Sequence, residues 1–312
     1  MVLSTRHPLL EARRVGEGAE RAILALDVPV NTAFEALYSY VVVDEPTVHL
    51  MPLHFLPPLA EGTVGREALL SLAVAAKLEY ARSRWIDEVV DRGSMASPSE
   101  MHRLHGALSD LIVARYREAL PGPMSAAFFG TLTALYSKHA ASVAIDGSRT
   151  RSRDVPPNKE EYSAQVRARN GSFRASVDAV LLLARAPKKL VETARESWHA
   201  WVLGAQLYDD ALDVEEDYES NHPTWTVGRT LDSIPQEDDG DRPPDHDRFY
   251  EAALTNGVLT ETLEWAESCF EDAANLAANE FPRWAAVQRG CVQQASRLRN
   301  DLQELTPRKS QR

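Results

Sequence analysis

Apolar and charged residues recur every three to four positions along nearly the whole chain, which is the spacing of amphipathic helices. The longest such run reaches from Arg66 to Asp91, and Gly93 follows it as the predicted C-cap. One stretch, 33–43, has a valine run and fits a helix or a strand. No strand-like alternation or internal repeat is seen elsewhere, so the pattern predicts an all-α fold built as a helical bundle.

Turn-forming and capping residues mark the helix ends. Ser97 with Pro98 and Asn158 with its following acids are typical N-termini. The run Asn170-Gly171-Ser172 lies inside a helical pattern and predicts a kink, because glycine is a poor helix former. The expected helices cover 66–91, 97–119, 124–145, 158–183 with that kink, 194–218, 249–280 and 282–305.

These boundaries predict one catalytic domain at 21–305. Residues 1–20 read as a polar arm that is frayed or loosely docked, and 306–312 as a polar tail. The stretch 232–248 is rich in Asp, Pro and Gly, and fits either a flexible loop or a lid over a site.

Composition narrows the class of protein. The chain has 312 residues, of which 44% are hydrophobic, enough for a large core. A net charge of −12 argues against nucleic acid or an anionic membrane surface as partner. The two cysteines, Cys269 and Cys291, predict a reducing compartment. Because no secretory signal or run of about 18 apolar residues is present, we expect a soluble, cytoplasmic protein without an integral membrane segment.

The clearest chemical signal is a stripe of acids at Asp209, Asp213 and Asp217. Residues four apart share a helix face, where like charges repel and cost stability. Oxygen ligands on consecutive turns suit Mg²⁺, which substrate phosphates would complete. A solvated acidic helix end is the alternative, but Asp87 and Asp91 repeat the spacing in the first long helix. Two such helices favour a metal site shared between them.

These two stripes carry a family resemblance. The run 80–91 is similar to the first aspartate motif of phytoene synthases. The run 206–217, followed by His222-Pro-Thr224, is similar to the second motif of prenyltransferases. Together they resemble the twin motifs of the class I isoprenoid synthases over about residues 60–300.

The resemblance implies a bundle around a central apolar cavity and a role in isoprenoid biosynthesis. It also implies a prenyl diphosphate substrate and three Mg²⁺ ions, and it allows a homodimer. The metal ligands and catalytic acids would be Asp87, Asp91, Asp209, Asp213 and Asp217. Asp210 and Glu88 lie off the acid faces, so a structural role is expected for them, and His222 is expected only to end the acid helix.

Other residues are candidates for binding the substrate. Arg167 and Arg169 precede the second motif at the spacing of the pyrophosphate-sensing Arg of terpene cyclases, and Arg167 is also a catalytic candidate. Lys138 and Arg174 are weaker candidates for the diphosphate. Ordinary surface arginines are the alternative for Arg167 and Arg169, and core packing is the alternative for Trp198 and Trp201. The candidates for the prenyl chain and the cation are Tyr80, Ser83, Trp198 and Trp201.

Departures from each subfamily leave the reaction open. The basic isopentenyl diphosphate site of chain-elongating enzymes has only Arg13-Arg14 as a counterpart, and Arg92 alone follows the first motif. The second motif is entirely acidic, unlike that of most terpene cyclases. The leading prediction is a Mg²⁺-dependent terpene synthase. The alternatives are a prenyltransferase acting on an isoprenoid or other acceptor, and a non-catalytic protein that binds prenyl diphosphates.

Overall fold

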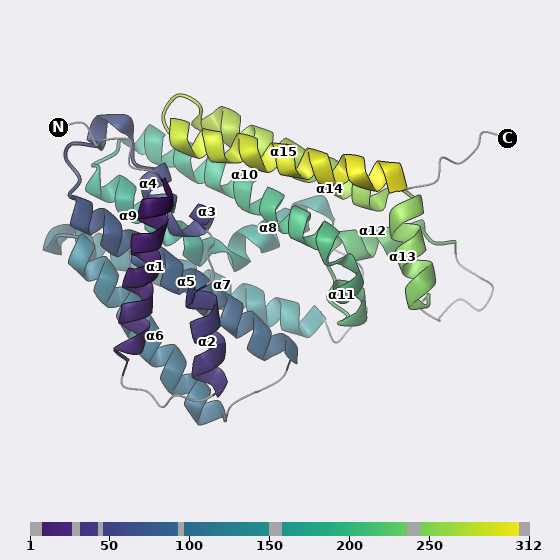
Figure 1. Ribbon diagram of the computed structural model, residues 1–312, viewed down its shortest axis with the longest axis horizontal. Coiled ribbons are helices and arrows are strands. Elements are labelled where there is room, and N and C mark those ends of the chain that lie inside the picture. The colour runs from purple at the N-terminus through teal and green to yellow at the C-terminus, as the bar shows by residue number, and fades with distance from the viewer. Residues whose placement is uncertain are drawn as a thin grey trace. The chain divides into compact units, whose positions relative to one another are not determined.

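The computed structural model describes residues 8–26, 32–42, 46–92, 97–149, 158–235 and 244–305. Every regular element in these ranges is helical (Figure 1), which confirms the all-α prediction. The α-helices are α1 (Pro8–Leu24), α2 (Thr32–Val42), α3 (Pro46–His49), α4 (Met51–His54), α5 (Arg66–Arg92), α6 (Pro98–Ala119), α7 (Gly122–Arg149), α8 (Lys159–Arg169), α9 (Ala175–Leu183), α10 (Lys188–Leu212), α11 (Val214–Glu219), α12 (Trp225–Ser233), α13 (His246–Thr255), α14 (Val258–Ala277) and α15 (Pro282–Leu305). The 3₁₀ turns are η1 (Pro58–Ala60) and η2 (Gly171–Arg174).

Two predicted helix starts have the expected caps. Ser97 accepts the N–H of Glu100 and begins α6, and the Glu100 side chain reaches back to the Ser97 N–H. Asn158 and Glu161 form the same reciprocal pair at the start of α8. Each pair satisfies two backbone donors that a helix start otherwise leaves without partners. The predicted kink is also present, since α8 ends at Arg169 and η2 separates it from α9.

The expectation of a frayed or loosely docked segment at residues 1–20 is wrong for residues 8–20. Pro8–Leu24 forms α1, which contacts α2 and α5. Its Ala12, Val15 and Ala19 are buried and recur at three- and four-residue steps, so one narrow face packs. The ambiguous stretch 33–43 is helical, within α2.

The helix expected at 249–280 is interrupted. Gly257 has a φ of 78°, in the left-handed region that glycine enters without steric cost. It separates α13 from α14, and the Asn256 side chain donates to the Ser233 carbonyl at 3.2 Å. Of the stretch read as a loop or lid, 236–243 lies outside the described residues, as does the tail 306–312. Residues 246–248 belong to α13.

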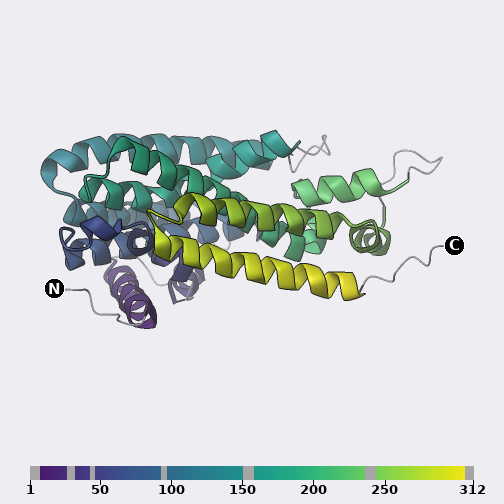
Figure 2. The same cartoon turned by 90° about the horizontal axis from the view of Figure 1, so that it is seen from above.

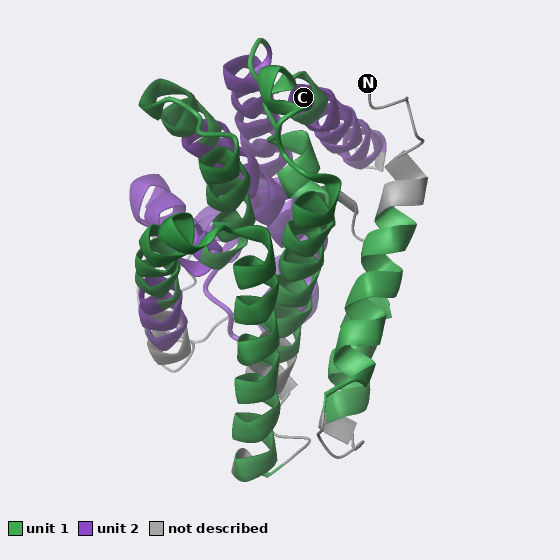
Figure 3. Ribbon diagram, turned by 90° about the vertical axis from the view of Figure 1, so that its left-hand side faces the viewer, with its two compact units in different colours: residues 1–136, 172–194, 279–284 green, residues 137–171, 195–278, 285–312 purple. Residues whose placement is uncertain are grey.

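The chain divides into two compact units, shown in green and purple in Figure 3. Unit 1 comprises residues 1–136, 172–194 and 279–284, and unit 2 comprises 137–171, 195–278 and 285–312. The prediction of a single catalytic domain concerns the relation between the units and stays a prediction.

In unit 1, α5 lies at the centre and contacts α1, α2, α3, α4, α6 and α9. A buried polar network stands on its α6-facing side. The Arg82 guanidinium donates to the Glu79 carboxylate at 2.6 Å and to Ser109 Oγ at 3.2 Å. It also lies 4.5 Å from the centre of the Tyr136 ring, and Tyr136 donates its hydroxyl to Glu79. The network joins α5, α6 and α7 around two charges removed from water.

In unit 2, an apolar cluster holds the helices that follow the second acid stripe. Phe249, Leu259 and Leu263 are almost fully buried in it. Tyr218 of α11 stacks on Phe249 of α13 with ring centres 3.8 Å apart. Helices α14 and α15 run antiparallel side by side (Figure 2), and Arg299 of α15 pairs with Glu267 of α14 at 3.3 Å. This packing fixes the region from α11 to α15.

Breaking the buried pair in unit 1 should destabilise the protein strongly. We expect Arg82→Met to lower the free energy of unfolding by about 3–5 kcal/mol, because Glu79 is then left buried without its cation. Arg115→Met removes a partly exposed i, i+3 partner of Glu118 and should cost at most about 1 kcal/mol. Urea denaturation of both variants measures this, and equal effects would contradict the burial argument.

Candidate functional site

The second acid stripe keeps its helical spacing across a break between two helices. Asp209 lies near the end of α10, Asp213 is the N-cap of α11, and Asp217 lies within α11. The expected continuous helix at 194–218 is therefore wrong at Asp213, whose ψ of 14° leaves the helix. The Asp213 N–H still donates to the Asp209 carbonyl at 2.9 Å, and the Asp217 N–H to the Asp213 carbonyl at 2.8 Å. Asp209 and Asp213 are both exposed to solvent.

Asp210 points into unit 2 instead of to solvent and is 1% exposed. Its carboxyl group accepts hydrogen bonds from the Tyr162 hydroxyl of α8 and from Gln206 Nε2 at 3.0 Å. Burial raises the pKa of Asp210 to about 7, and the charge of Asp217 adds to the rise, although the Tyr162 hydrogen bond opposes it. This arrangement agrees with the structural role expected for Asp210 and joins α8 to α10, the helix that carries Asp209.

His222 contacts the last acid of the stripe, although the sequence analysis gave it no role at the site. Asn221 has a φ of 56° and turns the chain back, so that the His222 N–H donates to the Asp217 carbonyl at 2.7 Å. His222 Nδ1 also lies 3.2 Å from Asp217 Oδ1. Burial alone would lower the pKa of His222, but the hydrogen bond and the charge of Asp217 outweigh it and raise the pKa. The Asn-His-Pro turn five residues after Asp217 was the available signal.

The two candidate arginines lie on different sides of α8. Arg169 is seven residues from Tyr162, close to two full turns, so it shares the side of α8 that meets Asp210. Burial raises the pKa of Tyr162, and Asp217 raises that of His222; the positive charge of Arg169 opposes part of each rise, as expected for a cation near these two side chains. His139 of α7 contacts the Arg169 carbonyl through Nδ1 and holds this end of the helix. Arg167 is exposed and lies on another side of α8.

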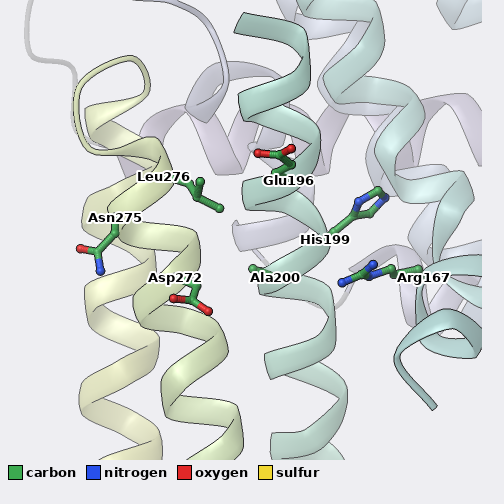
Figure 4. A pocket seen from close by; sticks show the side chains of 7 residues that line it. All are labelled: Arg167, Glu196, His199, Ala200, Asp272, Asn275 and Leu276. Atoms are coloured by element: carbon green, nitrogen blue, oxygen red, sulfur yellow. The ribbon is translucent and has the colours of Figure 1, made fainter. Parts of the chain in front are cut away.

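Arg167 lines an open groove of about 650 Å³ within unit 2. Its lining also includes Glu196, His199 and Ala200 of α10 and Asp272, Asn275 and Leu276 of α14. In Figure 4, Arg167 and Asp272 lie on opposite sides of Ala200. Ala200 precedes Asp209 by nine residues, which is about half a turn away around α10. This charged groove therefore opens on the opposite side of α10 from Asp209.

The two tryptophan candidates lie in the interior of unit 2. Trp198 is fully buried and Trp201 is 6% exposed, with ring centres 6.3 Å apart. Close packing surrounds them, because Ser197 donates to the Ala273 carbonyl at 2.7 Å and Gly204 lies against the Phe270 ring. A Cβ at Gly204 would lie 2.9 Å from that ring. Core packing explains both tryptophans, and their contact with a substrate stays a prediction. Lys138 is exposed on α7.

The first acid stripe lies in unit 1. Asp87 and Asp91 are in the last turns of α5, as predicted, and their side chains lie outside the described residues. Ser83, one turn earlier, is buried. Tyr80 packs edge-on against His49, with ring centres 5.7 Å apart, and lies 6.2 Å from Phe173 of η2. Burial lowers the pKa of His49 to about 3, with the positive charge of Lys77 adding to it, so this histidine is neutral. An aromatic group thus stands on the face of α5 that carries Asp87.

Several solved structures have the same fold along nearly the whole chain. The polyprenyl synthase from Caulobacter crescentus CB15, complexed with calcium and isoprenyl diphosphate, is similar with a TM-score of 0.73 and 18% identity, over 92% of this chain and 96% of that chain. The heptaprenyl diphosphate synthase from Staphylococcus aureus is similar with a TM-score of 0.71 and 13% identity, over 93% of this chain and 99% of that chain. The geranylgeranyl pyrophosphate synthase from Corynebacterium glutamicum, complexed with isoprenyl diphosphate and magnesium, is similar with a TM-score of 0.69 and 13% identity, over 93% of this chain and 98% of that chain.

The chain has the trans-prenyltransferase fold. It is the kind of fold that the resemblance of the twin acid motifs implies. The sequence matches no protein-family model and none of the curated proteins with which it was compared.

The carboxylates of the second acid stripe meet part of what a magnesium site requires. In the ranges that the structure describes, no three His, Cys, Asp or Glu side chains are grouped so as to hold a metal ion by themselves. Mg²⁺ needs only one or two carboxylates when waters and phosphate oxygens complete its shell. Asp209 and Asp213, exposed on consecutive turns, meet that requirement, and Asp217 is already oriented by His222.

The raised pKa of Asp210 predicts a pH-dependent stability. Its pKa is raised from 3.8 to about 7, so between these values the folded chain keeps a proton that the unfolded chain releases. The free energy of unfolding should therefore fall as pH rises through this window. We expect Asp210→Asn to remove that part of the fall. Urea denaturation between pH 4.5 and 7.5 with EDTA measures it.

The matched control is Asp209→Asn, which neutralises the exposed neighbour and should keep the fall with pH. The same pH profile in Asp210→Asn and the unmodified protein would show that burial does not hold the Asp210 proton.

Proposed function

We propose that the protein is a Mg²⁺-dependent prenyltransferase that moves the prenyl group of an allylic diphosphate to an acceptor. The observation that carries this proposal is the match in fold over nine-tenths of both chains to enzymes named as prenyl diphosphate synthases. Two of those structures are described with isoprenyl diphosphate and a divalent cation. These names favour prenyl transfer over the terpene synthase that the sequence analysis ranked first.

The chemistry assigns one task to each group of residues. The carbon–oxygen bond of the allylic diphosphate breaks, pyrophosphate leaves with the electron pair, and the allylic cation is attacked by electrons of the acceptor. Loss of a proton then completes the transfer. Bound Mg²⁺ would neutralise charge on the leaving pyrophosphate. We assign Asp87, Asp91, Asp209 and Asp213 to hold the metal, with Asp217 as the fifth ligand.

Arg169 is the better candidate than Arg167 for binding the diphosphate directly. Its charge acts on Tyr162 and His222, beside the acid helix. Arg167 instead shares a groove with Glu196 and Asp272. We further propose that Tyr80 and Ser83, which lie two turns and one turn before Asp87, contact the prenyl chain. A bulky aromatic side chain there would limit the chain length that fits.

A terpene synthase remains the second candidate because α8 ends in a break beside Arg169. That arrangement resembles the kinked, Arg-bearing helix on which the sequence prediction was based. The two candidates differ in whether product formation requires a second substrate.

No helix among the described residues combines the length and the apolar character needed to span a membrane.

The proposal is tested by incubating the protein and Mg²⁺ with C10, C15 and C20 allylic diphosphates, with and without isopentenyl diphosphate and nucleophilic acceptors. Mass spectrometry identifies the products. We expect a prenylated acceptor that forms only when acceptor and Mg²⁺ are both present. A hydrocarbon or alcohol formed without acceptor would support the terpene synthase, and no product from any substrate would contradict both enzymes.

Removing either acid stripe should abolish most turnover. We expect Asp87→Asn and Asp209→Asn each to lower kcat/KM by on the order of a hundredfold or more, because each loses a metal ligand. The fold should survive, since like-charge repulsion within each stripe is relieved. Asp232→Asn, an exposed acid paired with Arg229 on α12, is the control and should retain full activity. Normal rates in Asp209→Asn would rule out the second stripe as a metal site.

A further inference from the structure

Lys159, the first residue of α8, is held by two tryptophans from other helices. Its Nζ lies 5.0 Å from the centre of the Trp225 ring of α12 and 4.7 Å from that of Trp265 of α14. The two indoles meet edge to face with ring centres 5.1 Å apart. Glu261 of α14 lies 3.6 Å from the same Nζ. The ammonium group thus links α8 to α12 and α14 within unit 2. We call the four residues Lys159, Trp225, Trp265 and Glu261 the Lys159 clamp.

The position of Lys159 in its helix is electrostatically unfavourable. The first turn of a helix carries partial positive charge, so carboxylates are favoured there and cations are not. Glu160 and Glu161 follow that rule in α8, whereas Lys159 does not. An ammonium close to the ring centres of two indoles gains cation–π attraction, which offsets that disadvantage.

The clamp uses residues next to those assigned to the site. Trp225 is buried and directly follows Thr224, the N-cap of α12, at the end of the turn that carries His222. Trp265 also lies 6.4 Å from the Tyr162 ring. Helix α8 therefore has one anchor at Lys159, a second at the Tyr162–Asp210 hydrogen bond, and a third where His139 contacts the Arg169 carbonyl.

We propose that Lys159 is a positioning residue: its ammonium, seated on Trp225 and Trp265, fixes the start of α8 so that Arg169 stays beside the acid helix. The role of Arg169 in this statement rests on the proposed function. The fixing of α8 does not, because the residues of the clamp lie within unit 2 and need no ligand. The charge of the side chain is the essential property, so arginine should replace lysine and an uncharged chain of similar length should not.

The test compares Lys159→Met with Lys159→Arg, and with Lys188→Met as the control. Lys188 begins α10, is largely exposed, and pairs only loosely with Glu192 at 3.5 Å. Hydrogen exchange of residues 159–169 in the full chain is followed by mass spectrometry without ligands. We expect exchange in Lys159→Met to be faster by about tenfold or more, and to be restored in Lys159→Arg. Unchanged exchange in Lys159→Met overturns the clamp.

A second readout separates positioning from mere stability. KM and kcat for the allylic diphosphate are measured for the same variants, together with their thermal midpoints. We expect Lys159→Met to raise KM several-fold, with kcat less affected, and Lys159→Arg to recover it. Faster exchange with an unchanged KM overturns the positioning role. If the unmodified protein turns over no allylic diphosphate, the proposed function fails, and the exchange experiment still decides whether Lys159 fixes α8.

Discussion

The buried hydrogen bond between Tyr162 and Asp210 is the constraint on which the rest of unit 2 depends. A carboxyl group removed from water is costly unless it is hydrogen-bonded or neutral, and Asp210 meets both conditions through its partners and its raised pKa. Because Asp210 lies one residue from Asp209, the bond fixes the rotation of α10 about its axis. Asp209 and Asp213 are thereby kept at the surface while their neighbour is inside.

The same hydrogen bond determines which arginine of α8 lies near the second acid stripe. Because Tyr162 is hydrogen-bonded to Asp210, the side of α8 that includes Arg169 faces Asp217 and His222. Arg167, two residues away, is rotated by about 200° and lines a groove on the far side of α10 from Asp209. His222 completes the arrangement by binding Asp217 from the turn that leads into α12. The second motif is therefore supported by buried and partly buried polar contacts as well as by helix packing.

The sequence predicted the elements well where local chemistry determines them. The capping pairs at Ser97 and Asn158 and the break at Asn170-Gly171 depend on neighbouring residues, and these predictions are confirmed. The prediction failed where packing decides. Residues 8–20 look polar, yet small residues such as Ala12 and Ala19 suffice to pack α1. The break at Asn256-Gly257 lies within a strongly helical pattern of apolar residues, which by itself predicts one continuous helix. Choosing between Arg167 and Arg169 required knowing which side of α8 is buried, and no spacing rule supplies that.

The account is tested most directly by binding of inorganic pyrophosphate, which isolates the diphosphate site from the chemistry. Calorimetry in the presence of Mg²⁺ should give saturable binding to the unmodified protein and none with EDTA. Arg169→Gln should weaken this binding by about tenfold or more, since a charge-assisted contact is lost, and Arg167→Gln should leave it within about twofold. The opposite order, with Arg167→Gln weakening the binding and Arg169→Gln leaving it unchanged, would contradict the arrangement around Tyr162 and Asp210.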